Sequence, residues 1–128
     1  MNWKMFVVLA RGLAKQSFEA SQRAAVSCAY YGAFNLARRW LEANVTPIDD
    51  RRAHAQVWRT FENAGRATDQ TRPQWRKIGR LGNSLRAFRN QVDYDDEVDL
   101  SRRAAPRAVE TAEHILELLD ELRTEVSV

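Results

Sequence analysis

WRKIGRLGNSLRAFRNQVDYDD, residues 75–96, is the stretch from which the architecture can be worked out. Its apolar residues recur every three to four positions, as in a helix that buries one face. They are Trp75, Ile78, Leu81 or Gly82, Leu85, Phe88 and Val92. Six cations and no acid lie between Arg72 and Arg89, and five acids follow between Asp93 and Asp99. This reversal of charge predicts either a self-neutralising helix end or one wall of a binding site.

The composition around this stretch is that of one soluble globular domain. The hydrophobic fraction is 45% and the charged fraction 29% over 128 residues, which argues against a disordered chain. A chain of this length forms one hydrophobic core, so we predict a single domain over residues 1–128. Only five glycines and three prolines are present, which favours long helices joined by short loops.

Arginine dominates the positive charge. The net charge is only +3, but 17 of the 20 cations are arginine. Guanidinium groups bind phosphate and carboxylate through two parallel hydrogen bonds, so the position of arginine clusters indicates the partner better than net charge does.

The single cysteine, Cys28, cannot form an internal disulfide, and the apolar run 5–10 is too short for a membrane span or a signal peptide. We therefore expect a cytoplasmic protein without a membrane segment.

Two helices are predicted in the first third of the chain. Residues 2–17 place their apolar side chains on one face, which favours packing against the core. Residues 21–44 are rich in alanine and other small residues, which let neighbouring helices approach closely, so this should be the central helix. Within it, Tyr30 and Tyr31 cannot point the same way. Either one hydroxyl faces a cleft, or both are core tyrosines with solvated tips.

Two more helices complete the prediction. Asp49 or Asp50 is expected to cap a helix over residues 51–63 that ends at Gly65. Ser101 is the candidate cap of the last helix, whose many leucines indicate contact with a second subunit as well as the core. No alternating strand pattern is present. The predicted fold class is therefore all-α, an up-and-down bundle of about five helices.

Most enzyme signatures are absent. The chain has no glycine-rich phosphate loop, no zinc-protease motif and no serine-hydrolase motif. His54 falls on the buried side of its helix, where a hydrogen-bonded core histidine is the usual interpretation. No second histidine, cysteine or carboxylate stands at metal-ligand spacing, so neither a metal nor a cofactor is predicted.

Three segments taken together resemble the HEPN superfamily. They are SQRAAVSCAYYGAFNLAR at residues 21–38, His54, and LRAFRNQVDYDD at residues 85–96. They are similar to the branch with an AYYAxFhxA helix and an RxxADYD ending. The resemblance implies an up-and-down bundle that dimerises, with a cleft at the dimer interface. It also implies one of three roles: a partner of a minimal nucleotidyltransferase, a toxin in a toxin–antitoxin or defence locus, or an RNA-handling module.

The resemblance is incomplete at the residues that would cleave RNA. Catalytic members are metal-independent ribonucleases in which an arginine is followed four to six residues later by a histidine. Arg89 matches the arginine, but Tyr94, preceded by Asp93, occupies the histidine position. With ordinary pKa values of about 10 and about 3.9, these two side chains are poorly suited to proton transfer at neutral pH. Arg107 and His114 also have a suitable spacing, but they lie away from the motif position, and we interpret them as a coincidence.

The leading hypothesis is a dimeric HEPN-like protein that binds nucleotide or RNA phosphate, or a nucleotidyltransferase-type or antitoxin partner, without full ribonuclease activity. The residues expected to bind the nucleotide or RNA are Arg80, Arg86, Arg89, Asn90, Asp93 and Tyr94. One alternative is a metal-independent ribonuclease toxin that uses Arg89 with His54 or Tyr94. The other is a purely structural or antitoxin subunit in which an Arg89–Asp93 pair only stabilises the bundle.

Overall fold

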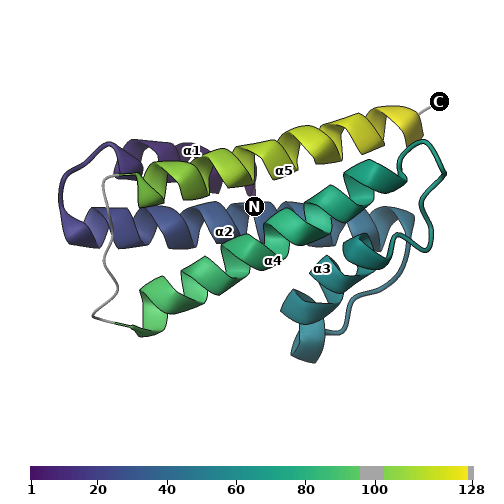
Figure 1. Ribbon diagram of the computed structural model, residues 1–128, viewed down its shortest axis with the longest axis horizontal. Helices are drawn as coiled ribbons and strands as arrows, with labels where there is room; N and C mark the ends of the chain where they lie inside the picture. Colours follow the sequence, from purple (N-terminus) through teal and green to yellow (C-terminus); the bar gives the residue numbers. More distant parts are fainter. Residues whose placement is uncertain (96–102, 127–128) are drawn as a thin grey trace.

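The computed structural model describes residues 1–95 and 103–126, with side chains to residue 123, and this part of the chain is entirely helical apart from its connections (Figure 1). Its elements in order are α1 (Lys4–Ala14), α2 (Glu19–Asn44), the short 3-10 helix η1 (Asp50–Arg52), α3 (Ala53–Asn63), α4 (Arg72–Tyr94) and α5 (Ala104–Val126). The predicted all-α bundle of about five helices is confirmed.

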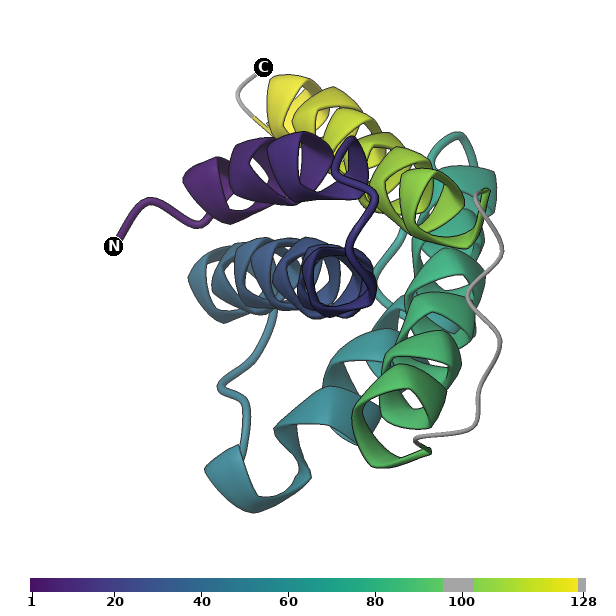
Figure 2. The same ribbon diagram turned by 90° about the vertical axis from the view of Figure 1, so that its left-hand side faces the viewer.

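Helix α2 is the centre of the bundle. It contacts each of the other four α-helices. Helices α1 and α5 cover one side of α2, and α3 and α4 lie on another (Figure 2). The small residues predicted to allow close approach do so: Ala25, Ala29 and Ala33 are fully buried, and a Cβ at Gly32 would stand only 2.7 Å from Val7 Cγ2.

Glycines allow α3 to lie directly against α4. A Cβ added at Gly79 would stand 2.6 Å from the backbone nitrogen of Glu62 and 2.8 Å from the carbonyl oxygen of Trp58, and one at Gly82 would overlap the Trp58 indole. Because Glu62 faces Gly79 and Trp58 faces Gly82, the two helices run antiparallel. One further turn along each helix brings His54 toward Arg86.

The ends of the helices differ in part from the predictions. Asp49, predicted to cap a helix that begins at residue 51, caps the short η1 instead, because its Oδ1 accepts from the Arg51 N–H at 3.1 Å. Helix α3 itself begins at Ala53 without a side-chain cap. Helix α3 ends at Asn63, as predicted, but Gly65 is not the left-handed residue that follows it; Ala64 is, with φ 52°. Ala64 is buried, and its methyl group packs in the core. This packing offsets the cost of the left-handed backbone conformation, which is about 1–2 kcal/mol for a residue other than glycine. The predicted cap Ser101 lies outside the described residues.

The leucines of α5 pack against the core of their own chain. Leu118, Leu119 and Leu122 are buried in the core, so their number does not call for a second subunit. Of the large apolar side chains that are exposed in the described residues, Met5, Val8 and Leu9 lie on α1. Within the described ranges, no helix is long and apolar enough to cross a membrane.

Candidate anion-binding site

Arg89 is the only charged residue in the buried core of the described chain, with 6% exposure. Its guanidinium carbon lies 5.0 Å from the ring centre of Tyr30 and 4.8 Å from that of Tyr31. Two adjacent residues of α2 thus contact the same cation of α4. Nη1 of Arg89 also donates to Oδ2 of Asp93 at 3.4 Å, and Ser27 Oγ donates to Oδ1 of Asp93 at 2.6 Å. Arg89 therefore ties α4 to the central helix.

A buried chain of hydrogen bonds sets the protonation of His54. The Trp58 indole N–H donates to the hydroxyl oxygen of Tyr30 at 3.1 Å, and that oxygen lies 2.7 Å from Nδ1 of His54. The indole can only donate, and Nδ1 of His54 is the acceptor beside the Tyr30 hydroxyl, so the hydroxyl satisfies its own proton by donating to Nδ1. This arrangement assigns the proton of the neutral imidazole to Nε2.

The surroundings of His54 keep the ring uncharged. Burial lowers its pKa from 6.5 to about 4, assisted by the positive charges of Arg89, Arg86 and Arg38. The ring also stacks on Phe34, with centroids 4.0 Å apart. At neutral pH, His54 is therefore a fixed hydrogen-bond donor through Nε2 and a poor proton acceptor.

A cleft of about 700 Å³ opens beside His54, between η1, α3 and α4. Its lining residues are Asp49, Arg51, Arg52, His54, Ala55, Gln56, Arg59 and Arg86. Four of these eight are arginines, and only one is an acid. A concave surface with this surplus of cationic donors is suited to an anion with several acceptor oxygens, such as a phosphate.

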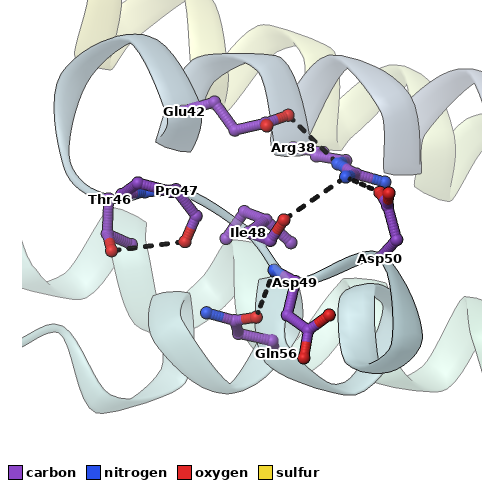
Figure 3. A network of polar contacts seen from close by, with 8 residues as sticks. All are labelled: Arg38, Glu42, Thr46, Pro47, Ile48, Asp49, Asp50 and Gln56. Carbon is purple, nitrogen blue, oxygen red and sulfur yellow. Dashed lines mark hydrogen bonds and ion pairs between the residues drawn. The ribbon is translucent and has the colours of Figure 1, made fainter.

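Polar contacts hold the connection between α2 and α3 in place (Figure 3). They fix the position of η1, whose arginines line the cleft. Nε of Arg38 donates to Glu42 at 3.0 Å, and its Nη2 contacts the carboxylate of Asp50 and the carbonyl of Ile48. The hydrogen bond that Arg38 donates to Asp50 raises the pKa of Arg38 above its ordinary value. The backbone N–H of Asp49 donates to Gln56 Oε1 at 3.0 Å. These contacts position the neighbouring Arg51 and Arg52.

The structure brings only some of the predicted site residues to this cleft. Arg86 and His54 line it. Arg89 lies beneath the surface, so a phosphate could reach it only by displacing Asp93 or a tyrosine ring. Arg51, Arg52 and Arg59 were missed by the sequence analysis. Arg51 and Arg52 could have been found from the sequence, because two adjacent arginines stand at a predicted helix start. Arg59 could not, because its position at the cleft depends on how α3 packs.

The remaining predicted residues follow α4 away from the cleft. Asn90 is half-buried, and Tyr94 is 80% exposed near the end of the helix. Arg80 lines a separate hollow of about 350 Å³ near the start of α4. Arg107, half of the second Arg–His spacing, lies in a groove between α4 and α5. In the described ranges, no group of three or more His, Cys, Asp or Glu side chains is placed to hold a metal ion.

Comparison with known proteins adds no relative. No family model, no curated protein and no solved structure matches this chain. The HEPN resemblance therefore stays a prediction from the motifs. The functional proposal below depends on the geometry of the described residues.

Removing the buried cation tests how far Arg89 is structural. We expect Arg89→Ala to lower the free energy of unfolding by about 2 kcal/mol, because it removes two cation–π contacts and a hydrogen bond to a carboxylate. Arg80→Ala is the control from the same helix; Arg80 is exposed, and its change should stay within about 0.5 kcal/mol. Urea denaturation measures both. Equal effects would show that the Arg89 contacts add no stability.

Proposed function

We propose that this chain binds a phosphate-bearing ligand, a nucleotide or RNA, in the cleft between η1, α3 and α4. One observation carries the proposal. His54 and Arg86 line the same cleft as Arg51, Arg52 and Arg59, so that four guanidinium groups and an uncharged imidazole are brought together from η1, α3 and α4. Phosphate oxygens accept such donors, and the guanidinium group contacts two oxygens at once.

We also propose that the protein is not a competent ribonuclease. Cleavage without a metal needs a group that takes up the proton of the 2′-hydroxyl near neutral pH. His54 is poorly suited, because Nδ1 already accepts from Tyr30 and its pKa is about 4. In this proposal, Arg86 contacts the phosphate, and Arg89 is a positioning residue that holds α4 against α2.

The wider role proposed is that of a HEPN-like homodimer in a toxin–antitoxin or defence setting, with an antitoxin or a nucleotidyltransferase as partner. The exposed apolar side chains of Met5, Val8 and Leu9 on α1 support a protein contact, because they are covered by no other element of the described chain. The purely structural alternative would use the same surface.

Binding to labelled RNA in EDTA tests the proposed function. We expect salt-sensitive binding without cleavage, because phosphate contacts release counterions. Arg86→Gln should weaken binding by roughly 10- to 100-fold, the loss expected for a charged hydrogen bond. Lys15→Gln removes one exposed charge from the end of α1, a helix without contacts to α3 or α4, and should leave binding unchanged. Fluorescence anisotropy measures affinity, and gel electrophoresis detects cleavage.

The contrary outcomes separate the alternatives. Cleavage in EDTA that is lost in His54→Ala would favour the ribonuclease toxin. Cleavage lost only in His114→Ala would show that the Arg107–His114 spacing is functional. If neither nucleotide nor RNA binds, the structural or antitoxin subunit is favoured.

A further inference from the structure

One face of α4 carries a row of polar side chains, which is interrupted at the buried Gly79, where α3 packs against the helix. At about 100° per residue, seven of them fall within roughly 120° of arc. They are Arg72, Arg76, Arg80, Asn83, Arg86, Asn90 and Tyr94. We call this row the α4 stripe. None of its members is buried, and over 22 residues it extends about 33 Å at 1.5 Å per residue.

The α4 stripe is positively charged along most of its length. Asp93, the one acid of α4, lies off the stripe and is paired with Arg89. Arg72 is partly neutralised by Asp69 at 2.5 Å, but Arg76 and Arg80 are exposed beside it in the hollow of about 350 Å³. Farther along the helix, Arg86 belongs both to the stripe and to the cationic cleft.

Tyr94 ends the stripe with an exposed aromatic ring. All other large exposed hydrophobic side chains of the described residues lie at or before Phe18. Tyr94, 80% exposed, is thus the one such ring on the stripe, and nothing else in the described chain covers it. Proteins that bind single strands combine a cationic track for phosphates with aromatic rings on which bases stack.

We propose that a single-stranded nucleic acid lies along the α4 stripe, with its phosphates on Arg76, Arg80 and Arg86 and a base stacked on Tyr94. This inference rests on the proposed function and deepens it, because it names an extended strand as the ligand. A compact mononucleotide would occupy the cleft alone and leave Arg76, Arg80 and Tyr94 unused. A track of this length accommodates on the order of five to ten nucleotides.

The dependence on strand length is the first test. The full chain is titrated with UMP, UTP and labelled uridine oligomers of increasing length, from dinucleotide to dodecamer. Affinity should rise with length until the stripe is filled and then level off. A deoxythymidine octamer distinguishes the source of the strand: equal affinity indicates recognition of phosphate and base, whereas weaker affinity indicates additional contacts to the 2′-hydroxyl of RNA.

Charge removal on matched helices is the second test. The double variant Arg76→Gln/Arg80→Gln should reduce the slope of log affinity against log salt by about 1.4 for the uridine octamer, at about 0.7 for each phosphate contact. Lys4→Gln/Lys15→Gln removes the same charge from α1, which has no contact with α4, and should leave the slope unchanged.

The role of Tyr94 is tested with a strand that carries bases and with an abasic strand. Tyr94→Ala should weaken binding of the octamer by between about 5-fold and 100-fold, and Tyr94→Phe should retain the wild-type affinity, because stacking requires only the ring. An abasic strand of the same length should bind wild type and Tyr94→Ala equally.

Two results would overturn the inference. One is UTP binding as tightly as the octamer, and the other is equal effects of the α1 and α4 double variants. In either case, the proposed function still stands if UTP binding depends on Arg86. If no nucleotide or strand of any length binds, the proposed function fails as well.

Discussion

Gly82→Ala is expected to lower the free energy of unfolding by about 3 kcal/mol or more. The new Cβ would overlap three atoms of the Trp58 indole, well inside the 3.0 Å separation that real Cβ atoms keep. Trp58 cannot move away, because it is fully buried and its N–H is bonded to Tyr30. The methyl group must therefore push α3 away from α4.

Gly12→Ala provides the matched control. A Cβ at Gly12 meets nothing within 4 Å on α1, so the same substitution there should stabilise the protein by up to about 1 kcal/mol through helix propensity. Urea denaturation of the two variants should give changes of opposite sign. A loss at Gly82 no larger than about 0.5 kcal/mol would mean that α3 and α4 are not packed closely there.

Stability should fall as the pH is lowered from 6.5 toward 4, with a contribution from His54 of up to about 3 kcal/mol. The pKa of His54 is about 4 in the folded chain and 6.5 in the unfolded chain. Between these values the unfolded chain binds more protons, so the stabilising contribution is complete above 6.5 and is lost as pH falls through 4. The cause is burial of the ring, followed by the charges of Arg89 and Arg86.

His54→Phe isolates this contribution from other groups that titrate in the same range. The variant loses the Tyr30 hydrogen bond and should be less stable than wild type at pH 7.5. Because phenylalanine does not titrate, that difference should shrink as the pH approaches 4.5. Urea denaturation across the range and an NMR titration of the imidazole measure it. An imidazole midpoint near 6.5 in the folded protein would contradict the expected effect.

The apolar periodicity of the chain was enough to predict the fold class and the position of the most positively charged helix, α4. Apolar spacing is a local property, and small residues such as Ala29 and Ala33 mark a central helix wherever they occur. The sequence also showed that arginines of α4 lie on one face, because residues spaced by four share a face of any helix.

The environment of each charge depended on packing between distant segments. Arg86 and Arg89 are only three residues apart, yet one lines a cleft and the other is enclosed by Tyr30 and Tyr31 of α2. The pKa of His54 is lowered because packing buries its ring against α2 and places it near Arg89 and Arg86. The contribution of Arg59 to the cleft depends on the glycine contact between α3 and α4. Periodicity identifies which residues share a helix face, but burial, tautomer and cleft shape arise only where faces of different helices meet.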